Sequence, residues 1–253
     1  MRDVLTTALN TPVGRLTEVL LKRIRKGENG SEMPDVIRRR LDQLVSAPGE
    51  FGKLARVRVA VEVSSLFEKA PNWTAERVVP IFEWRSPEAA DAWHARRYSN
   101  YIGSAKLFEL TRQSFLELFR RPEMTHEDLR VYGTWITVLM LANRTRDAKY
   151  PITATDARSA LRAAGTRVLP SVAHRLAIEM ESIKLEQKHT HWVNVVGPVF
   201  ESIWPLDAEL QSSSATFNLV QILRASGDAF PQAAEVIIPF IRPEDPCLLS
   251  ELT

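Results

Sequence analysis

HWVNVVGPVFESIWPLDAELQSSSATFNLVQILRASGDAFPQAAEVIIPFIRP, residues 191–243, is the stretch that decides the fold. Apolar residues recur in it at helical spacing. Pro205 and the pair Gly227-Asp228 divide it into three expected helices, at 192–204, 215–225 and 229–241. The stretch therefore predicts consecutive short helices joined by short connections.

The same pattern continues through the rest of the chain. Apolar residues at helical spacing, bounded by Pro, Gly or a capping Ser or Thr, predict further helices. We expect these near 12–26, 34–47, 51–69, 75–84, 88–98, 104–119, 129–141, 156–164 and 168–187. Thr155 is the expected cap of the helix at 156–164. With about eleven helices and no convincing strand, the sequence predicts an all-α fold.

One segment fits two secondary structures. Val57, Val59, Val61 and Val63 alternate along the chain as the residues of a strand would. The length of the segment 51–69, its alanine and leucine content and its helical neighbours favour a helix instead. This helix is apolar over much of its circumference, so we expect it to lie at the centre of the fold.

A recurring Pro-Phe motif predicts how the helices are arranged. It occurs as Val79-Pro80-Ile81-Phe82, Gly197-Pro198-Val199-Phe200 and Ile238-Pro239-Phe240, with steps of 118 and 41 residues between the prolines (198 − 80 and 239 − 198). A period near 40 is typical of HEAT-like helix pairs, and 118 is close to three such periods. The motif therefore favours an irregular HEAT-like α-solenoid. The alternative is a chance recurrence, because Arg121-Pro122 stands where a copy is missing but lacks the apolar flanks.

Composition limits the class of protein. The 253 residues are 45% hydrophobic and 25% charged, with 33 Lys+Arg against 31 Asp+Glu, so no global charge points to nucleic acid or membrane. The single cysteine, the lack of a long apolar run and the lack of a signal peptide predict a cytoplasmic protein without membrane contact. We expect one α-helical repeat domain over residues 1–253, with a possible subdivision near the polar stretch 143–153.

The known catalytic and cofactor motifs are missing from the sequence. It has no phosphate-binding glycine loop, no nucleophile elbow and no paired cysteines. Cys247 has no basic neighbour and is expected to be inert. His189 and His191 point about 200° apart on a helix, too far to converge on a metal. The sequence thus predicts a protein without enzymatic activity, cofactor or metal.

Cations and aromatics are the remaining candidates for a binding surface. Arginines cluster at residues 23–25 and 38–40, where a basic helix face would bind nucleic acid, although cations are also common on solvated faces and helix ends. Trp, Tyr and Arg together are typical of protein interfaces. The protein-binding hypothesis uses Trp93, Arg96, Arg97 and Tyr98, and the nucleic-acid hypothesis uses Arg23, Arg25, Arg38, Arg39 and Arg40.

A family resemblance covers most of the chain. The strings WVNVVGPVFESIWP, FNLVQILRASGDAFP and IIPFIRP in residues 192–243, with TPVGRLTEVLL, VVPIFEWRSPEAADAW and THEDLR upstream, resemble the C-terminal helical region of large bacterial proteins. Many of those proteins carry an N-terminal sirtuin-like NADase domain and are linked to anti-phage defence. This chain has no glycine-rich nucleotide loop, so no NAD-hydrolysing residue is carried over. The resemblance implies a scaffold or sensor region that acts beside an effector, and residues 245–253 read as the start of a further helix.

The hypothesis is therefore a non-catalytic helical module of a bacterial anti-phage defence system. We expect it to bind a phage protein or an effector subunit, and nucleic acid is the alternative partner. A steep salt dependence of binding would favour nucleic acid.

Overall fold

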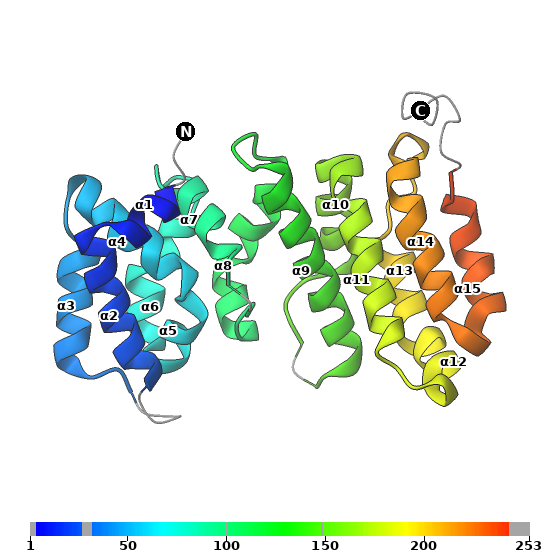
Figure 1. Cartoon of the computed structure of the whole chain (residues 1–253), viewed down its shortest axis with the longest axis horizontal. Coiled ribbons are helices and arrows are strands. Elements are labelled where there is room, and N and C mark those ends of the chain that lie inside the picture. The colour runs from blue at the N-terminus through cyan, green and yellow to red at the C-terminus, as the bar shows by residue number, and fades with distance from the viewer. Residues whose placement is uncertain (1–3, 27–31, 100, 148, 243–253) are drawn as a thin grey trace. The chain divides into compact units, whose positions relative to one another are not determined.

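The computed structural model describes residues 4–26, 32–99, 101–147 and 149–242. Within these ranges every regular element is helical and there is no strand, which confirms the all-α prediction (Figure 1). The α-helical segments in the described ranges number fifteen, one of them only four residues long, rather than about eleven. No described helix has the length and apolar character needed to cross a membrane. Cys247 and the stretch 245–253 lie outside the described residues.

The chain divides into two compact units, Met1–Phe115 and Leu116–Thr253. Unit 1 contains α1 (Val4–Asn10), α2 (Pro12–Lys26), α3 (Asp35–Val45), α4 (Gly49–Val61), α5 (Val63–Lys69), α6 (Pro71–Arg77), the 3-10 segment Val79–Phe82, α7 (Ala89–Arg96) and most of α8 (Ala105–Glu117).

Helix α4 is the central element of unit 1. It packs against α1, α2, α3 and α7 and buries Leu54, Val57 and Val59, as its nearly continuous apolar surface predicts. The expected single helix over 51–69 is wrong in one respect, because Glu62 (φ −100°, ψ 11°) separates α4 from α5. The β-branched neighbours of Glu62 crowd a helical turn, which favours a break at this point.

Unit 2 contains α9 (His126–Thr145), α10 (Ala154–Ala164), α11 (Leu169–Glu181), α12 (Lys188–His191), α13 (Gly197–Ile203), α14 (Ser213–Ala225) and α15 (Phe230–Ile237). A π-helical segment, Trp192–Val196, leads into α13, and 3-10 segments cover Leu118–Arg120, Gly165–Arg167, Leu185–Gln187, Ala208–Leu210, Gly227–Ala229 and Ile238–Phe240.

Helix α11 packs between α9 and α14, and the three lie side by side in Figure 1. The close approach of α9 to the start of α11 depends on a glycine. A Cβ added at Gly133 would lie 1.9 Å from Val168 Cγ2, so only glycine fits without a shift of the two segments. The expected helix over 168–187 ends at Glu181, and Leu185–Gln187 forms a separate 3-10 turn.

The boundaries of α9 and α10 depend on two capping boxes. Thr125 caps α9 through Asp128, so the helix begins at His126, three residues before the expected start at residue 129. For α10 the expected cap at Thr155 is wrong. The Thr153 hydroxyl accepts a hydrogen bond from the Asp156 amide at 3.1 Å, and the helix begins at Ala154.

The polar stretch 143–153 lies within unit 2, between the last turn of α9 and the start of α10. The Tyr150 amide donates to Asn143 Oδ1 at 2.7 Å, and Asn143 Nδ2 donates to the Tyr150 carbonyl at 2.9 Å. These two bonds fasten the loop to the end of α9.

All three Pro-Phe motifs begin a helical segment. Pro80 and Pro239 lie in the first positions of 3-10 segments, and Pro198 lies at the start of α13. Pro198 and Pro239 directly continue a preceding helical segment, and the helix changes type there because proline has no N–H to donate to the preceding turn. The phenylalanines then pack on tryptophans, with ring centroids 4.9 Å apart for Phe82 and Trp93 and 4.9 Å for Phe200 and Trp204.

Candidate functional site

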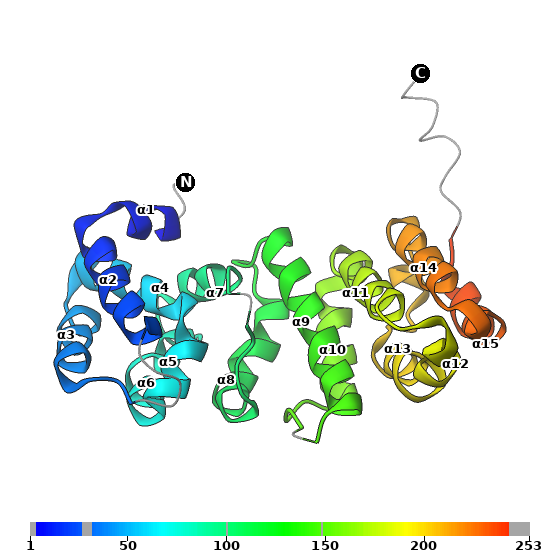
Figure 2. The same cartoon turned by 60° about the horizontal axis from the view of Figure 1, so that its bottom comes forward.

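A groove of about 460 Å³ lies between α2 and α3 in unit 1, where Figures 1 and 2 show the two helices next to each other. Its walls combine aliphatic side chains with two arginines and a glutamine. The lining residues are Leu16, Leu20, Arg23, Val36, Ile37, Arg40, Gln43 and Leu44.

The two helices present matching faces to this groove. Leu16, Leu20 and Arg23 follow one another at i, i+4 and i+7 on α2, so they share one face. Val36, Arg40 and Gln43 repeat this spacing on α3. Other residues of both helices, such as Leu21 and Leu41, form the buried face.

The groove face is apolar but remains open to solvent. Leu16 is 52% exposed and Val36 is 64% exposed, although both are large aliphatic residues. Isolated exposed aliphatics are common, whereas a contiguous apolar groove framed by polar residues is typical of an interaction site. The α2–α3 groove is therefore the candidate functional site.

Among the residues that the structure describes, no carboxylate lines the α2–α3 groove. Arg40 Nη1 donates to Gln43 Oε1 at 3.0 Å, a neutral acceptor. Arg23 is exposed, and its guanidinium makes no ion pair with any residue that the structure describes. The positive charges of Arg23 and Arg40 are thus available to a ligand.

The other arginines of the nucleic-acid hypothesis lie elsewhere. Arg25 pairs with Glu18 at 2.9 Å and also with Glu62. Arg38 pairs with Asp35 at 2.6 Å, and Arg39 is exposed on α3. Of the five predicted arginines, only Arg23 and Arg40 line the groove, and Arg25 and Arg38 already have carboxylate partners.

Two of the four residues predicted to bind protein are buried in the structure. Trp93 is 2% exposed and Arg96 is 3% exposed, so their expected role as surface contacts is wrong. Trp93 Nε1 donates to the Phe82 carbonyl at 3.0 Å, and the indole also packs against Phe115. Both side chains lie in the core because α7 packs against α4.

Arg97 and Tyr98 are at the surface at the end of α7. Tyr98 is exposed, and the Arg97 guanidinium lies 4.8 Å from the centre of its ring. Arg97 Nη2 also donates to the Tyr98 hydroxyl at 2.7 Å. These two residues form a small exposed pair, but they do not line the α2–α3 groove.

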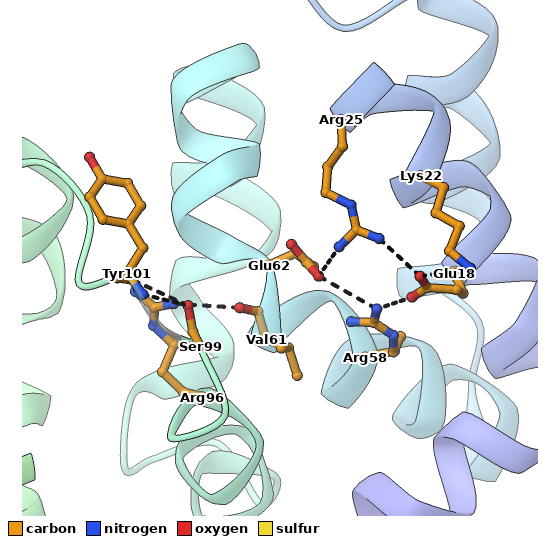
Figure 3. Close-up of polar contacts among 9 residues, drawn as sticks. All are labelled: Glu18, Lys22, Arg25, Arg58, Val61, Glu62, Arg96, Ser99 and Tyr101. Atoms are coloured by element: carbon orange, nitrogen blue, oxygen red, sulfur yellow. Dashed lines mark hydrogen bonds and ion pairs between the residues drawn. The ribbon is translucent and has the colours of Figure 1, made fainter. Parts of the chain in front are cut away.

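Arg96 donates to several oxygen atoms, and two of them, the Val61 and Tyr101 carbonyls, are drawn in Figure 3. Its Nη2 donates to Ser64 Oγ at 2.6 Å, to the Ile102 carbonyl at 2.8 Å and to the Tyr101 carbonyl at 3.1 Å. Neighbouring Gly103 has φ +100°, and a Cβ there would come within 2.7 Å of Ser64 Oγ. The buried guanidinium fastens the connection after α7 to α5, which is a structural role.

A second buried arginine lies in a charged network between α2 and α4, also drawn in Figure 3. Arg58 pairs through Nη2 with Glu18 and, at 3.5 Å, with Glu62. Its Nε and Nη1 atoms are buried without a hydrogen-bond partner. Burial lowers the pKa of the Arg58 guanidinium, and the charge of Glu62 opposes that shift.

The face of α4 toward α7 carries two further ion pairs. Arg56 forms a two-pronged pair with Glu88, at 2.6 Å for each oxygen. Lys53 pairs with Asp91 at 2.8 Å, and this hydrogen bond raises the pKa of the Lys53 ammonium. The cations of α4 therefore have structural partners, in contrast to those of the groove.

His189 and His191 lie on α12 and have different neighbours. His191 Nε2 is 3.3 Å from Glu179 Oε1, and His189 is 3.4 Å from the Gln232 amide nitrogen. Across the described ranges no group of three or more His, Cys, Asp or Glu residues could hold a metal ion.

Comparison with known proteins yields one distant relative. The chain is 22% identical over 240 residues to the uncharacterised protein y4cA of Sinorhizobium fredii (strain NBRC 101917 / NGR234). The alignment covers 92% of this chain but 20% of the relative, so the chain spans about a fifth of that protein's length. No family model matches the chain, and no solved structure matches it.

Proposed function

We propose that this chain is a non-catalytic, HEAT-like helical module that binds protein within a cytoplasmic bacterial anti-phage defence system. Catalysis would come from an effector in another domain or subunit. The α2–α3 groove carries the binding part of this proposal. The resemblance of residues 192–243 to the helical region of large defence proteins supports the assignment to defence. The much greater length of the relative in Sinorhizobium fredii supports the role of a module.

The chemistry of the groove favours one kind of partner. An amphipathic helix places its apolar side chains into such a groove, with anchors at i, i+3, i+4 and i+7. Leu16 and Val36 supply apolar surface, and Arg23 and Arg40 supply positive charge at the sides. We therefore propose that the partner is a protein helix with an apolar stripe flanked by Asp or Glu.

The experiment is a selection of helical peptides from a displayed library with randomised faces. The protein is the target, and the double variant Leu16→Asp/Val36→Asp is the counter-target. We expect the selected helices to combine Leu, Ile or Phe with Asp or Glu. Binding to the double variant should be at least about tenfold weaker, because two carboxylates then occupy the apolar wall.

A matched control separates this effect from general damage to the surface. Leu110 on α8 is 49% exposed in the same unit but does not line the groove. The Leu110→Asp variant should bind the selected helices as the unchanged protein does. Helices that bind the double variant equally well, or no selection above background, would contradict the proposal.

The assignment to defence needs its own test. The complete gene locus, with the unchanged chain or with Leu16→Asp/Val36→Asp, is transferred to a phage-sensitive bacterium and challenged with a panel of phages. We expect protection from at least one phage with the unchanged chain and loss of that protection with the variant. If neither locus protects, the defence assignment fails while the groove remains testable by the peptide selection.

Nucleic acid remains the alternative partner because Arg23, Arg39 and Arg40 are exposed on α2 and α3, two helices that pack together. Binding that releases several counterions weakens steeply as salt rises, with a log–log slope of about −0.9 per phosphate for duplex DNA. We expect oligonucleotide binding to be absent at physiological salt, because Arg25 and Arg38 are already paired with carboxylates. A steep slope would favour the alternative.

A further inference from the structure

A second depression lies in unit 2, where α10 and α13 pack together (Figure 2). It has a volume of about 380 Å³ and differs from the α2–α3 groove in its lining. Its walls combine two arginines with three hydroxyl groups, and no carboxylate is among them. The lining residues are Ala154, Thr155, Arg158, Ser159, Arg162 and Ser202.

One face of α10 supplies most of this lining. Thr155, Arg158, Ser159 and Arg162 follow one another at i, i+3, i+4 and i+7, so they share a face. The opposite face of α10, with Ala157, Ala160, Leu161 and Ala164, is buried in unit 2. The register of α10 therefore gathers guanidinium and hydroxyl groups on one side.

The carboxylate nearest in sequence is occupied. Asp156 Oδ2 accepts from the Thr153 amide at 3.0 Å and from the Thr153 hydroxyl at 2.7 Å, as part of the capping box. Asp156 thus serves the helix end and does not line the depression. Asp156 is therefore not among the residues that could neutralise the arginines within the depression.

The arginines around the depression differ in whether a carboxylate neutralises their charge. Arg162 pairs with Asp207 at 2.5 Å. Arg158 donates through Nη2 to the Glu201 backbone carbonyl, and its Nε is buried without a partner. Arg120, beside the depression, donates to Ser159 Oγ at 2.9 Å. Among the described residues Arg158 and Arg120 have no carboxylate partner, so two positive charges are left for a ligand.

We propose that the α10–α13 depression binds a small molecule that carries a phosphate group. A guanidinium fork matches the oxygens of phosphate, and hydroxyl groups add further hydrogen bonds. The volume lies within the range of about 300–1,000 Å³ that small-molecule sites occupy. A nucleic-acid strand would need a longer track of cations than these two or three. This inference does not depend on the α2–α3 groove.

The test is a titration of the whole chain with inorganic phosphate, pyrophosphate and AMP. Binding is measured by calorimetry or from the NMR shifts of arginine side chains. Adenosine is the uncharged counterpart of AMP. We expect the phosphate-bearing probes to bind with millimolar or lower Kd and adenosine not to bind. No binding of any probe up to about 10 mM, or equal binding of adenosine and AMP, would overturn the proposal.

Variants locate the site. Arg158→Gln should weaken phosphate binding at least about tenfold. Arg130→Gln is the matched control, because Arg130 is an exposed arginine of unit 2 that pairs with Glu127 at 3.1 Å away from the depression. Thermal unfolding shows whether Arg158→Gln still folds. If it does not, Ser202→Ala replaces it, with a smaller expected loss of about threefold.

Two results count against the site even if phosphate binds. Equal weakening by Arg130→Gln and Arg158→Gln would show non-specific ion binding. An oligonucleotide that binds much more tightly than AMP, with a log–log salt slope steeper than about −3, would show a nucleic-acid surface instead.

Discussion

Unit 1 uses arginine in two contrasting environments, the interior around α4 and the rim of the α2–α3 groove. In the interior, Arg58 and Arg96 are buried, and carboxylates, a hydroxyl and backbone carbonyls surround them. At the groove, Arg23 and Arg40 are exposed beside aliphatic side chains and have no carboxylate partner within the described part of the chain. Because the side chain is the same, the difference lies in its surroundings. The buried arginines stabilise the fold, and the exposed arginines are available to a partner.

The substitution Arg96→Met tests the interior most strongly. It removes the donor to Ser64 and to three backbone carbonyls while keeping a similar volume. Buried acceptors that lose their donor cost about 1–3 kcal/mol each, so we expect the free energy of unfolding of unit 1 to fall by about 3 kcal/mol. Urea denaturation followed by circular dichroism measures this. Arg97→Met, the partly exposed neighbour, should change stability by less than about 0.5 kcal/mol.

Glu18→Gln should have the next largest effect. Glu18 pairs with Lys22, Arg25 and Arg58, so its loss leaves the buried Arg58 with Glu62 at 3.5 Å as the remaining carboxylate. We expect a loss of about 2 kcal/mol, since an incompletely paired buried charge is costly. Glu76→Gln, at an exposed position of α6, is the control. Equal stability of the two variants would show that the ion pairs of Glu18 contribute nothing to the free energy of unfolding.

Arg58→Met should cost less than Arg96→Met. Two nitrogens of Arg58 are buried without a partner, and its burial disfavours the charged form, as the lowered pKa indicates. Replacing such a group by an apolar side chain removes a desolvation penalty along with the ion pairs. We expect a loss of about 1 kcal/mol or less in the same urea experiment. A loss as large as that of Arg96→Met would contradict the ranking of the two buried arginines.

Groove substitutions should have the smallest effect on stability. Leu16→Ser and Val36→Ser change side chains that are already largely exposed, so each should shift the free energy of unfolding by less than about 0.5 kcal/mol. Leu21→Ser on the buried face of α2 should be far more destabilising. If the groove substitutions destabilise unit 1 as strongly as Leu21→Ser does, then the groove is part of the core.

Sequence patterns predict most of the helices but not their interruptions. Helical spacing predicts α2 and α9, whereas the break at Glu62 depends on crowding and on charges brought from α2. The two-unit division is not visible in the sequence, because α8 runs without a Pro or Gly across the position where the contacts separate. The HEAT-like arrangement remains a prediction.

The candidate site was only partly predictable. Arg23 and Arg40 belong to the predicted basic clusters, but no prediction singles out the aliphatic wall beside them. The spacing of Leu16, Leu20 and Arg23 could have separated this face from that of Leu21 and Ile24. Trp93 and Arg96 show the opposite error. Their residue types are typical of an interface, but both side chains are buried, because sequence alone does not show which side of α7 meets α4.

The most direct test of the central claim is a charge exchange between the groove and its partner helix. A helix is first selected on the unchanged protein. Its binding to the double variant Arg23→Glu/Arg40→Glu is then measured by fluorescence anisotropy, once with the original helix and once with its Asp and Glu residues changed to Lys. We predict at least about tenfold weaker binding of the original helix and recovery with the Lys helix. Unchanged binding of the original helix to the charge-reversed groove would contradict the claim that Arg23 and Arg40 select the partner.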